Sequence, residues 1–279
     1  MRKPTLRHIA NLWTLMGHPS PAREWSLDQK LHAIKAAGFD GVCWAGSREL
    51  HEGTLKHGLT FVGGMSTGNA AEFPRLLKEQ KDCGAVQVNV QLADDWTLTP
   101  EALPLALALN REGKRIGLVP AIESHRDTCT ETPEKSFALA DAYQRETGEL
   151  LPMSWDFSHF AVVKHLAPGN FIQRLLVRRD LIQHAQQFHF RPFNGHHAQV
   201  PVTDGRGNLT MEVRDWLPFA EALLKCWLEG NRDSEREIFV CPELGPLESG
   251  YALSIFPSSW EDAKVLRAEI EKLWSKVAA

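Results

Sequence analysis

The stretch Thr99–Glu123, TPEALPLALALNREGKRIGLVPAIE, contains the repeating unit of an α/β fold. Thr99 and the proline after it are typical of an N-cap followed by proline at the first helical position, and they predict a helix that ends near Gly113. The apolar run Ile116–Ile122 then predicts a buried strand that ends at the carboxylate of Glu123. Helices alternating with short strands indicate a parallel sheet.

The same alternation continues along the whole chain. Eight short apolar runs predict strands: Ile9–Trp13, Gly41–Trp44, Thr60–Gly64, Val86–Val90, Ile116–Ile122, Leu151–Trp155, Phe188–Phe190 and Ile238–Cys241. Helical periodicity predicts helices at Ser26–Gly38, Phe73–Gly84, Thr99–Gly113, Thr132–Gly148, Trp216–Trp227 and Trp260–Leu273. We therefore expect one (β/α)8 barrel over residues 1–279. A doubly wound open sheet is the alternative, but no Gly-x-Gly-x-x-Gly motif follows the first run.

Composition and charge narrow the function classes. The chain has 279 residues, 43% apolar residues and a formal net charge of −4, so bulk charge does not suggest a nucleic-acid partner. No apolar stretch approaches about 18 residues, so no membrane span is expected. The N-terminus does not resemble a signal peptide, and the five cysteines are widely spaced and odd in number. We expect reduced thiols, most of them buried, in a cytoplasmic protein.

Four polar side chains stand at or near the ends of neighbouring runs. They are Glu123, Asp156, His189 and Glu243, from the fifth to the eighth run. Parallel strands that end together would bring three carboxylates and an imidazole to one point, where the carboxylates would repel one another without a cation. This donor set predicts one divalent cation, Mn²⁺, Mg²⁺ or Co²⁺, with Zn²⁺ as an alternative.

Each of these residues also has a simpler interpretation. A single Glu or Asp at a strand end is more often a helix cap or a surface charge, and His189 between two phenylalanines fits a core histidine. Burying even one unpaired charge costs on the order of several kcal/mol. Four such groups beside apolar residues therefore favour a common explanation.

Longer motifs surround the four residues and resemble a known family. They are Ile122-Glu123-Ser124-His125-Arg126-Asp127-Thr128, Asp156-Phe157-Ser158-His159, His189-Phe190-Arg191 and Pro242-Glu243-Leu244-Gly245-Pro246. Together they resemble the xylose-isomerase-like (β/α)8 superfamily, which contains sugar isomerases, ketose 3-epimerases and endonuclease-IV-type repair enzymes. The order Glu, Asp, His, Glu is similar to the metal ligands of the epimerase branch, and the resemblance implies that His159 contacts substrate. It also allows a homo-oligomer, since relatives of this kind often form dimers or tetramers.

The chain departs from two branches of this family. Epimerases carry a second substrate-contacting Glu shortly after the first ligand, where this chain has Cys129-Thr130-Glu131. The repair enzymes need many His and Glu ligands for three zinc ions, and the early strands here end in other residues: Asn11, Trp44, Ser66, Asn89 and Gln91. An endonuclease-IV-like nuclease is therefore a weaker alternative.

The resulting hypothesis is a metal-dependent sugar isomerase or epimerase acting on a small carbohydrate. Glu123 and Glu243 would move a proton on the carbon beside a carbonyl, through an enediolate. The residues expected to bind substrate oxygens are His125, Arg126, His159 and Arg191, although the two arginines could equally pair with the ligand carboxylates. At most two of Trp13, Trp44, Trp96 and Trp155 are expected at the pocket. A metal-dependent hydrolase or lyase on the same barrel, and a non-catalytic sugar-binding barrel, stay open.

The segment Asn194–Asn208 is long and rich in Gly, His, Asp and Asn. We expect it to form a loop over the barrel mouth. His196 and His197 within it are expected to be exposed to solvent.

Overall fold

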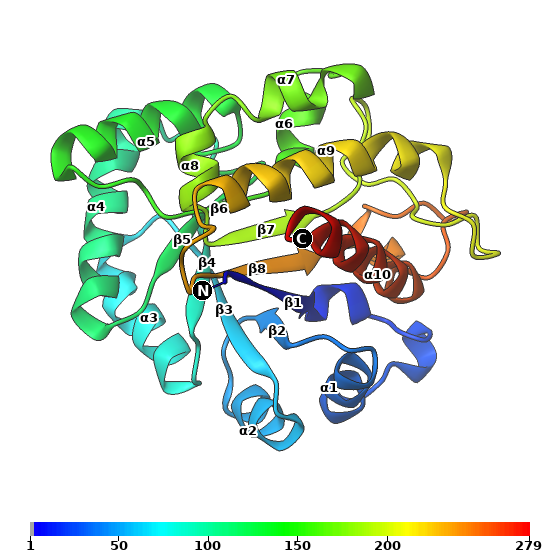
Figure 1. The fold of residues 1–279 in the computed structure, drawn as a ribbon. Helices are drawn as coiled ribbons and strands as arrows, with labels where there is room; N and C mark the ends of the chain where they lie inside the picture. The colour runs from blue at the N-terminus through cyan, green and yellow to red at the C-terminus, as the bar shows by residue number, and fades with distance from the viewer. Residues whose placement is uncertain (1–2) are drawn as a thin grey trace.

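The computed structural model describes residues 3–279, in which eight parallel strands close into a barrel surrounded by helices (Figure 1). Neighbouring strands follow chain order, and β8 pairs with β1. The predicted (β/α)8 barrel is confirmed, and an open sheet is excluded because the sheet has no edge. The strands are β1 (Thr5–Asn11), β2 (Gly41–Trp44), β3 (Thr60–Thr67), β4 (Gln87–Leu92), β5 (Pro120–Ser124), β6 (Met153–Trp155), β7 (Gln187–Phe190) and β8 (Glu237–Pro242).

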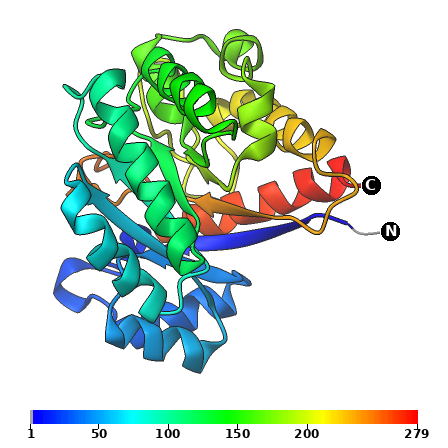
Figure 2. The ribbon, with the colours of Figure 1, turned by 90° about the vertical axis from the view of Figure 1, so that its left-hand side faces the viewer.

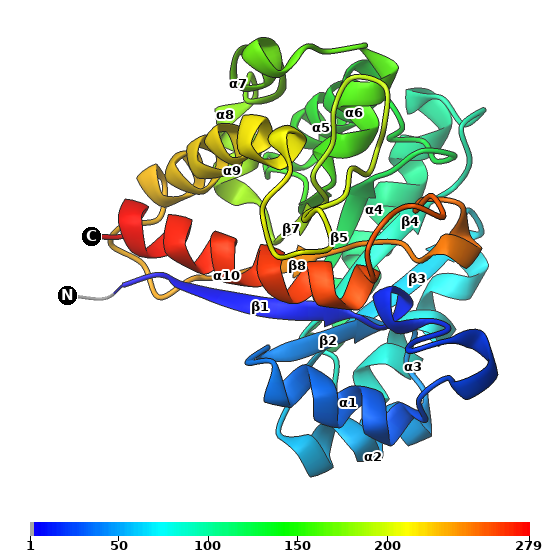
Figure 3. The ribbon, with the colours of Figure 1, turned by 90° about the vertical axis from the view of Figure 1, so that its right-hand side faces the viewer.

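The helices cover the outside of the barrel, and α10 lies along β1 (Figures 2 and 3). Both ends of the chain lie on the side where β1 begins, so the opposite rim carries the carboxyl ends of the strands. Within residues 3–279, no helix combines the length and the apolar character that crossing a membrane requires. The helices are α1 (Leu27–Ala36), α2 (Arg48–His57), α3 (Phe73–Asp82), α4 (Thr99–Ile116), α5 (Pro133–Thr147), α6 (Phe157–Val163), α7 (Phe171–Leu175), α8 (Arg179–His184), α9 (Met211–Glu229) and α10 (Ser259–Val277).

Helix α4 is longer than predicted, because Gly113 lies inside it and does not end it. A Cβ atom at Gly113 would lie 2.5 Å from Cδ of Pro120, so only glycine lets the helix pack this closely on β5. Gly117 ends the helix instead, with a left-handed φ of 67°. The predicted run from Ile116 therefore divides between two elements: Ile116 is the last helical residue, and β5 begins at Pro120.

Other local signals have mixed outcomes. Ser26 and Thr132 cap α1 and α5 as their sequences indicate, each accepting a backbone hydrogen bond three residues later. Thr99 is the first residue of α4 and not its N-cap, which is Leu98. Helix α2 was not expected, because it buries little of its surface and has a weak apolar pattern; its buried residues are Leu50 and Thr54.

The loop at Asn194–Asn208 connects β7 to α9 and is anchored along part of its length (Figure 3). The buried Asp262 carboxylate accepts hydrogen bonds from the Thr203 backbone N–H and hydroxyl, at 3.2 and 2.7 Å. His196 and His197 are exposed, as predicted. The segment is therefore held against α10 by buried hydrogen bonds.

Candidate metal centre

The four predicted ligands meet at the carboxyl-terminal rim of the barrel. Glu123 lies in β5, His189 in β7, and Asp156 and Glu243 directly follow β6 and β8. Strand register explains the convergence, because alternate residues of a strand point to the same face. Ser154 lies opposite Glu123, and Asp156 follows two residues later. In the same way, Cys241 lies opposite His189, and Glu243 follows it by two residues.

The ligand atoms of these four side chains lie within 4.8 Å of one another, and all four residues are buried. Nδ1 of His189 is 3.0 Å from Oε1 of Glu123 and 3.0 Å from Oε2 of Glu243. Oδ2 of Asp156 is buried and lies 3.0 Å from Nη2 of Arg191 and 3.3 Å from Nε2 of His159. Three buried carboxylates and one imidazole fit a divalent cation, so the cluster could hold one. The predicted convergence is confirmed.

Three amide side chains orient the two glutamates. Nδ2 of Asn89 and Nε2 of Gln91 donate to Oε2 of Glu123 at 2.7 and 3.2 Å. Nδ2 of Asn11 donates to Oε1 of Glu243 at 2.5 Å. In the sequence these amides stand only at strand ends that lack further metal ligands. The sequence signal for two of them is the alternation of Gln87, Asn89 and Gln91 with apolar residues in one strand, which indicates a polar face inside the barrel.

Arg191 lies within the acidic cluster. It is 2% exposed, and its Nη2 atom is 3.0 Å from Oδ2 of Asp156 and 2.5 Å from Oε2 of Glu243. Burial would raise the pKa of Asp156, but the charges of Arg191 and His159 outweigh burial and hold that pKa below its usual range. Pairing with the ligand carboxylates, one of the two predicted roles of Arg191, is therefore observed.

The remaining predicted substrate-binding residues differ in position. His125 and Arg126 line a cavity of about 400 Å³ together with Arg191. His159 is buried, with Nε2 3.3 Å from Oδ2 of Asp156 and its ring 4.5 Å from that of His125. His159 thus contacts a candidate metal ligand, whereas the other three residues reach the cavity wall.

Two adjoining cavities open at the site, since both have Glu243 in their walls. The second, of about 370 Å³, contains Glu123 and His189. Trp13 lines the first cavity and Trp44 lines both, whereas Trp96 is 84% exposed elsewhere and Trp155 is a core residue. The limit of two tryptophans at the pocket is therefore confirmed.

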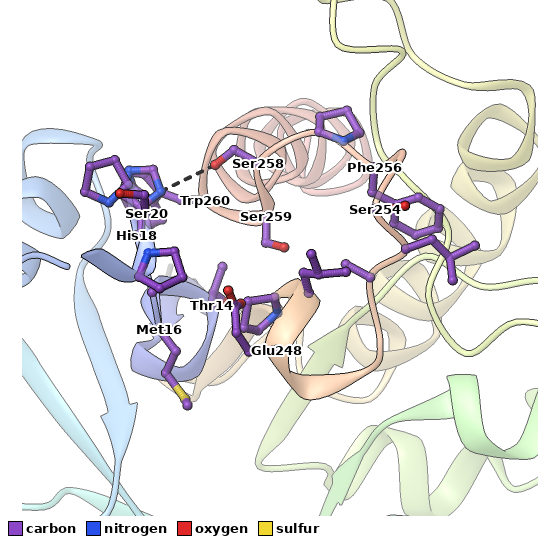
Figure 4. A pocket seen from close by; sticks show the side chains of 18 residues that line it. Thr14, Met16, His18, Ser20, Glu248, Ser254, Phe256, Ser258, Ser259 and Trp260 are labelled. Atoms are coloured by element: carbon purple, nitrogen blue, oxygen red, sulfur yellow. Dashed lines mark hydrogen bonds between the residues drawn. The ribbon is translucent and has the colours of Figure 1, made fainter. Parts of the chain in front are cut away.

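A third cavity lies beside the site, between the segment after β1 and the segment before α10 (Figure 4). It has a volume of about 260 Å³, and its wall includes His18, Glu248 and Ser258 but none of the four candidate ligands. Oγ of Ser258 and Nδ1 of His18 lie 3.5 Å apart across it. Glu123, His189 and Glu243 therefore border the two cavities inside the rim and not this third one.

Glu131 does not supply the second glutamate of the epimerases. Its Oε1 atom pairs with Nζ of Lys135 at 2.7 Å, and Glu131 is not part of either wall of the site. The five cysteines are free, and only Cys83 among them is not buried. Burial raises the pKa of the Cys129 thiol to about 12, which fits its role as a packing residue.

Cation affinity should rise with pH, because His189 must lose a proton to become a ligand. Burial would lower the pKa of His189, but Glu123 and Glu243 outweigh burial and raise it well above 6.5. Its charged form therefore stabilises the metal-free fold below its unfolded pKa, and this contribution is lost as pH rises through the folded pKa. Calorimetric titration with Mn²⁺ should show affinity increasing up to about tenfold per pH unit between about pH 6 and about pH 8.

The H189Q variant is the matched control for this titration, because it keeps a polar side chain but carries no proton to release. Its affinity for Mn²⁺ should be weaker and nearly independent of pH. Equal affinity of the unaltered protein at both ends of the range would contradict the role of His189 as a ligand.

No family model and no curated protein matches this sequence. Solved structures match over nearly the whole chain. L-ribulose 3-epimerase is similar with a TM-score of 0.66 at 11% identity, covering 98% of this chain and 96% of that chain. D-psicose 3-epimerase, solved in the presence of D-fructose, has a TM-score of 0.58 at 13% identity. The match covers 96% of this chain and 99% of that chain.

A xylose-isomerase-like TIM barrel protein from Mycobacterium smegmatis, in complex with magnesium, has a TM-score of 0.61 at 15% identity and covers 98% of each chain. These similarities concern the fold, since sequence identity is low throughout. The chain therefore shares the (β/α)8 barrel fold of these structures.

Proposed function

We propose that this protein is a divalent-metal-dependent isomerase or epimerase of a small carbohydrate. The observation that carries the proposal is the buried cluster of three carboxylates and one imidazole at the rim of the barrel. The fold supports it, because structures that share the fold include L-ribulose 3-epimerase and D-psicose 3-epimerase. The residues proposed as ligands are Glu123, Asp156, His189 and Glu243.

A bound Mn²⁺, Mg²⁺ or Co²⁺ would supply Lewis-acid polarisation of a substrate carbonyl, which acidifies the neighbouring carbon. The protein supplies the proton carriers. Glu123 and Glu243 both reach the same point beside His189, and amide donors hold their outer oxygens in place. Fixing both carboxylates in advance lowers the cost of bringing a base to the reacting carbon.

One glutamate would remove the proton beside the carbonyl, and the enediolate would receive a proton in return. Return by the other glutamate from the opposite face gives an epimer. Return to the former carbonyl carbon, with the neighbouring hydroxyl proton passing to the former carbonyl oxygen, gives the aldose–ketose isomer. Trp13 and Trp44 stand in the cavity wall, where flat apolar rings can stack on the apolar face of a sugar ring.

We also propose a cytoplasmic location. The five free cysteines support it, because thiols stay reduced in that compartment.

Metal analysis followed by exchange of deuterium from solvent tests this function. The Mn²⁺-loaded protein should introduce deuterium at the carbon beside the carbonyl of an accepted ketose, as read by mass spectrometry and NMR. A hydrolase or lyase would release a product without this label, and a sugar-binding barrel would leave the ketose unlabelled. Either result, or a purified protein that binds no divalent cation, would contradict the proposal.

A further inference from the structure

Two arginines and a tyrosine form one wall of the cavity of about 400 Å³ at the site. Arg126 follows β5, Arg191 follows β7, and Tyr251 lies in the segment between β8 and α10. The guanidinium carbons of both arginines lie 4.4 Å from the centroid of the Tyr251 ring. The same aromatic ring therefore holds two permanent positive charges beside the space that a substrate would occupy.

The hydrogen-bonding capacity of these arginines is not used up by the protein. Arg191 donates through Nη2 to the acidic cluster, but Nε and Nη1 are buried without a hydrogen-bond partner in the described part of the chain. For Arg126, Nε is 3.9 Å from Oδ2 of Asp127, which is beyond hydrogen-bond distance. The side chain of Asp127 is 86% exposed. A buried donor without a partner is unfavourable, so Nε and Nη1 of Arg191 favour an acceptor that comes from outside, whereas the half-exposed side chain of Arg126 can donate to the same acceptor from the cavity wall.

The free donors of the two guanidinium groups point to an anionic acceptor. With a divalent cation bound, the three carboxylates and Arg191 would balance its charge, which leaves the guanidinium of Arg126 in the cavity wall beside the solvent-exposed carboxylate of Asp127, 3.9 Å away. Guanidinium groups bind carboxylate and phosphate through paired, charge-assisted hydrogen bonds, whereas a hydroxyl offers a single, uncharged acceptor atom. Glu243 lines both cavities, so one ligand could reach the cluster and this wall together.

We propose that Arg126, Tyr251 and Arg191 recognise an anionic substituent, a carboxylate or a phosphate, on the carbohydrate substrate. This inference rests on the proposed function and names the substrate class: an acidic sugar. The carbonyl end of the substrate would face the acidic cluster, and its anionic group would face the two guanidinium groups.

Three probes of similar chain length test the inference without turnover, because none has an aldehyde or ketone group. They are D-glucitol, D-gluconate and D-glucitol 6-phosphate, titrated calorimetrically into the Mn²⁺-loaded protein. At least one anionic probe should bind about ten- to hundredfold more tightly than glucitol, which is the range expected for hydrogen bonds to charged groups. Whichever anion is preferred distinguishes a sugar acid from a sugar phosphate.

The R126Q variant should lose most of this preference, because it lacks one of the two guanidinium groups that would bind the anion. Arg126 touches no candidate metal ligand, so the cation site should stay intact in this variant. The R145Q variant is the matched control: Arg145 is an exposed arginine in the last turn of α5, and its loss should leave the preference intact. Equal binding of all three probes would overturn the inference, as would a preference that survives in R126Q, since the cation would then be binding the anion.

The outcome separates this inference from the proposed function. If deuterium exchange occurs with a neutral ketose and the anionic probes bind no more tightly than glucitol, the proposal of an acidic substrate is wrong. The proposed isomerase or epimerase activity is then still supported. If no exchange occurs with neutral or acidic ketoses, the proposed function itself is wrong, and binding of an anionic probe would then describe only a binding site.

Discussion

Replacing Glu243 by glutamine should abolish deuterium exchange into the substrate. The carboxylate lies at the centre of the site: it contacts Nδ1 of His189 at 3.0 Å and pairs with Arg191. The E243Q variant loses a proton carrier and one charge of the cation site at once. Loss of a positioned base alone is worth about 10²–10⁴-fold in rate, and weaker cation binding adds to it. The measurement is the exchange rate at saturating Mn²⁺, with cation content determined in parallel.

Glutamine has nearly the same size as glutamate and keeps a hydrogen-bond acceptor for Asn11, so E243Q should stay folded, as checked by circular dichroism. The E248Q variant is a suitable control, because Glu248 is an exposed residue of the same connection between β8 and α10 and lines only the neighbouring cavity (Figure 4). Its exchange rate should not change. Undiminished exchange in a folded E243Q variant would remove Glu243 from the mechanism.

Replacing Arg191 by methionine should lower the free energy of unfolding of the metal-free protein by about 3–5 kcal/mol. Arg191 is fully buried, and its Nη2 atom serves both Asp156 and Glu243. Methionine fills part of the same volume without charge, so two buried carboxylates lose their permanent positive partner. Urea unfolding after removal of divalent cations measures this loss.

The same experiment with Mn²⁺ present should recover a large part of the lost stability, because a bound cation neutralises the same carboxylates and stabilises the folded state by mass action. The R126M variant is the matched control: Arg126 packs on the same Tyr251 ring but has no carboxylate within hydrogen-bond distance. Its stability should change by less than about 1 kcal/mol. Equal losses in R191M and R126M would show that Arg191 does not neutralise the cluster.

Local signals in the sequence predicted the barrel because strands and helices depend on residues close along the chain. Ser26 and Thr132 cap helices where their side chains reach the third backbone N–H, and this geometry involves four consecutive residues. The ends of α4 were predicted less well. In the sequence, Gly113 is typical of a helix end. In the structure it lies inside α4, where the absence of a Cβ atom allows close packing on Pro120, a contact between two elements.

The candidate ligands could be predicted because a topological rule links sequence to space: side chains at the carboxyl ends of parallel barrel strands share one rim. The supporting residues follow no such rule. Asn11 reaches Glu243 across 232 positions of the chain, and Tyr251 packs on two arginines from different loops. Glu131 is the opposite case, since it stands near the expected position in sequence but pairs with Lys135 instead.

The sequence by itself determined the order of helices and strands, the closed barrel as the best arrangement of eight such units, and the four residues that meet at its rim. These follow from periodicity and from the fixed direction of parallel strands. Only the tertiary structure showed that Arg191 lies within the acidic cluster, that His159 is turned toward Asp156, and that two guanidinium groups share the Tyr251 ring. Side-chain partners across the rim depend on strand register, rotamers and burial, which no short stretch of sequence specifies.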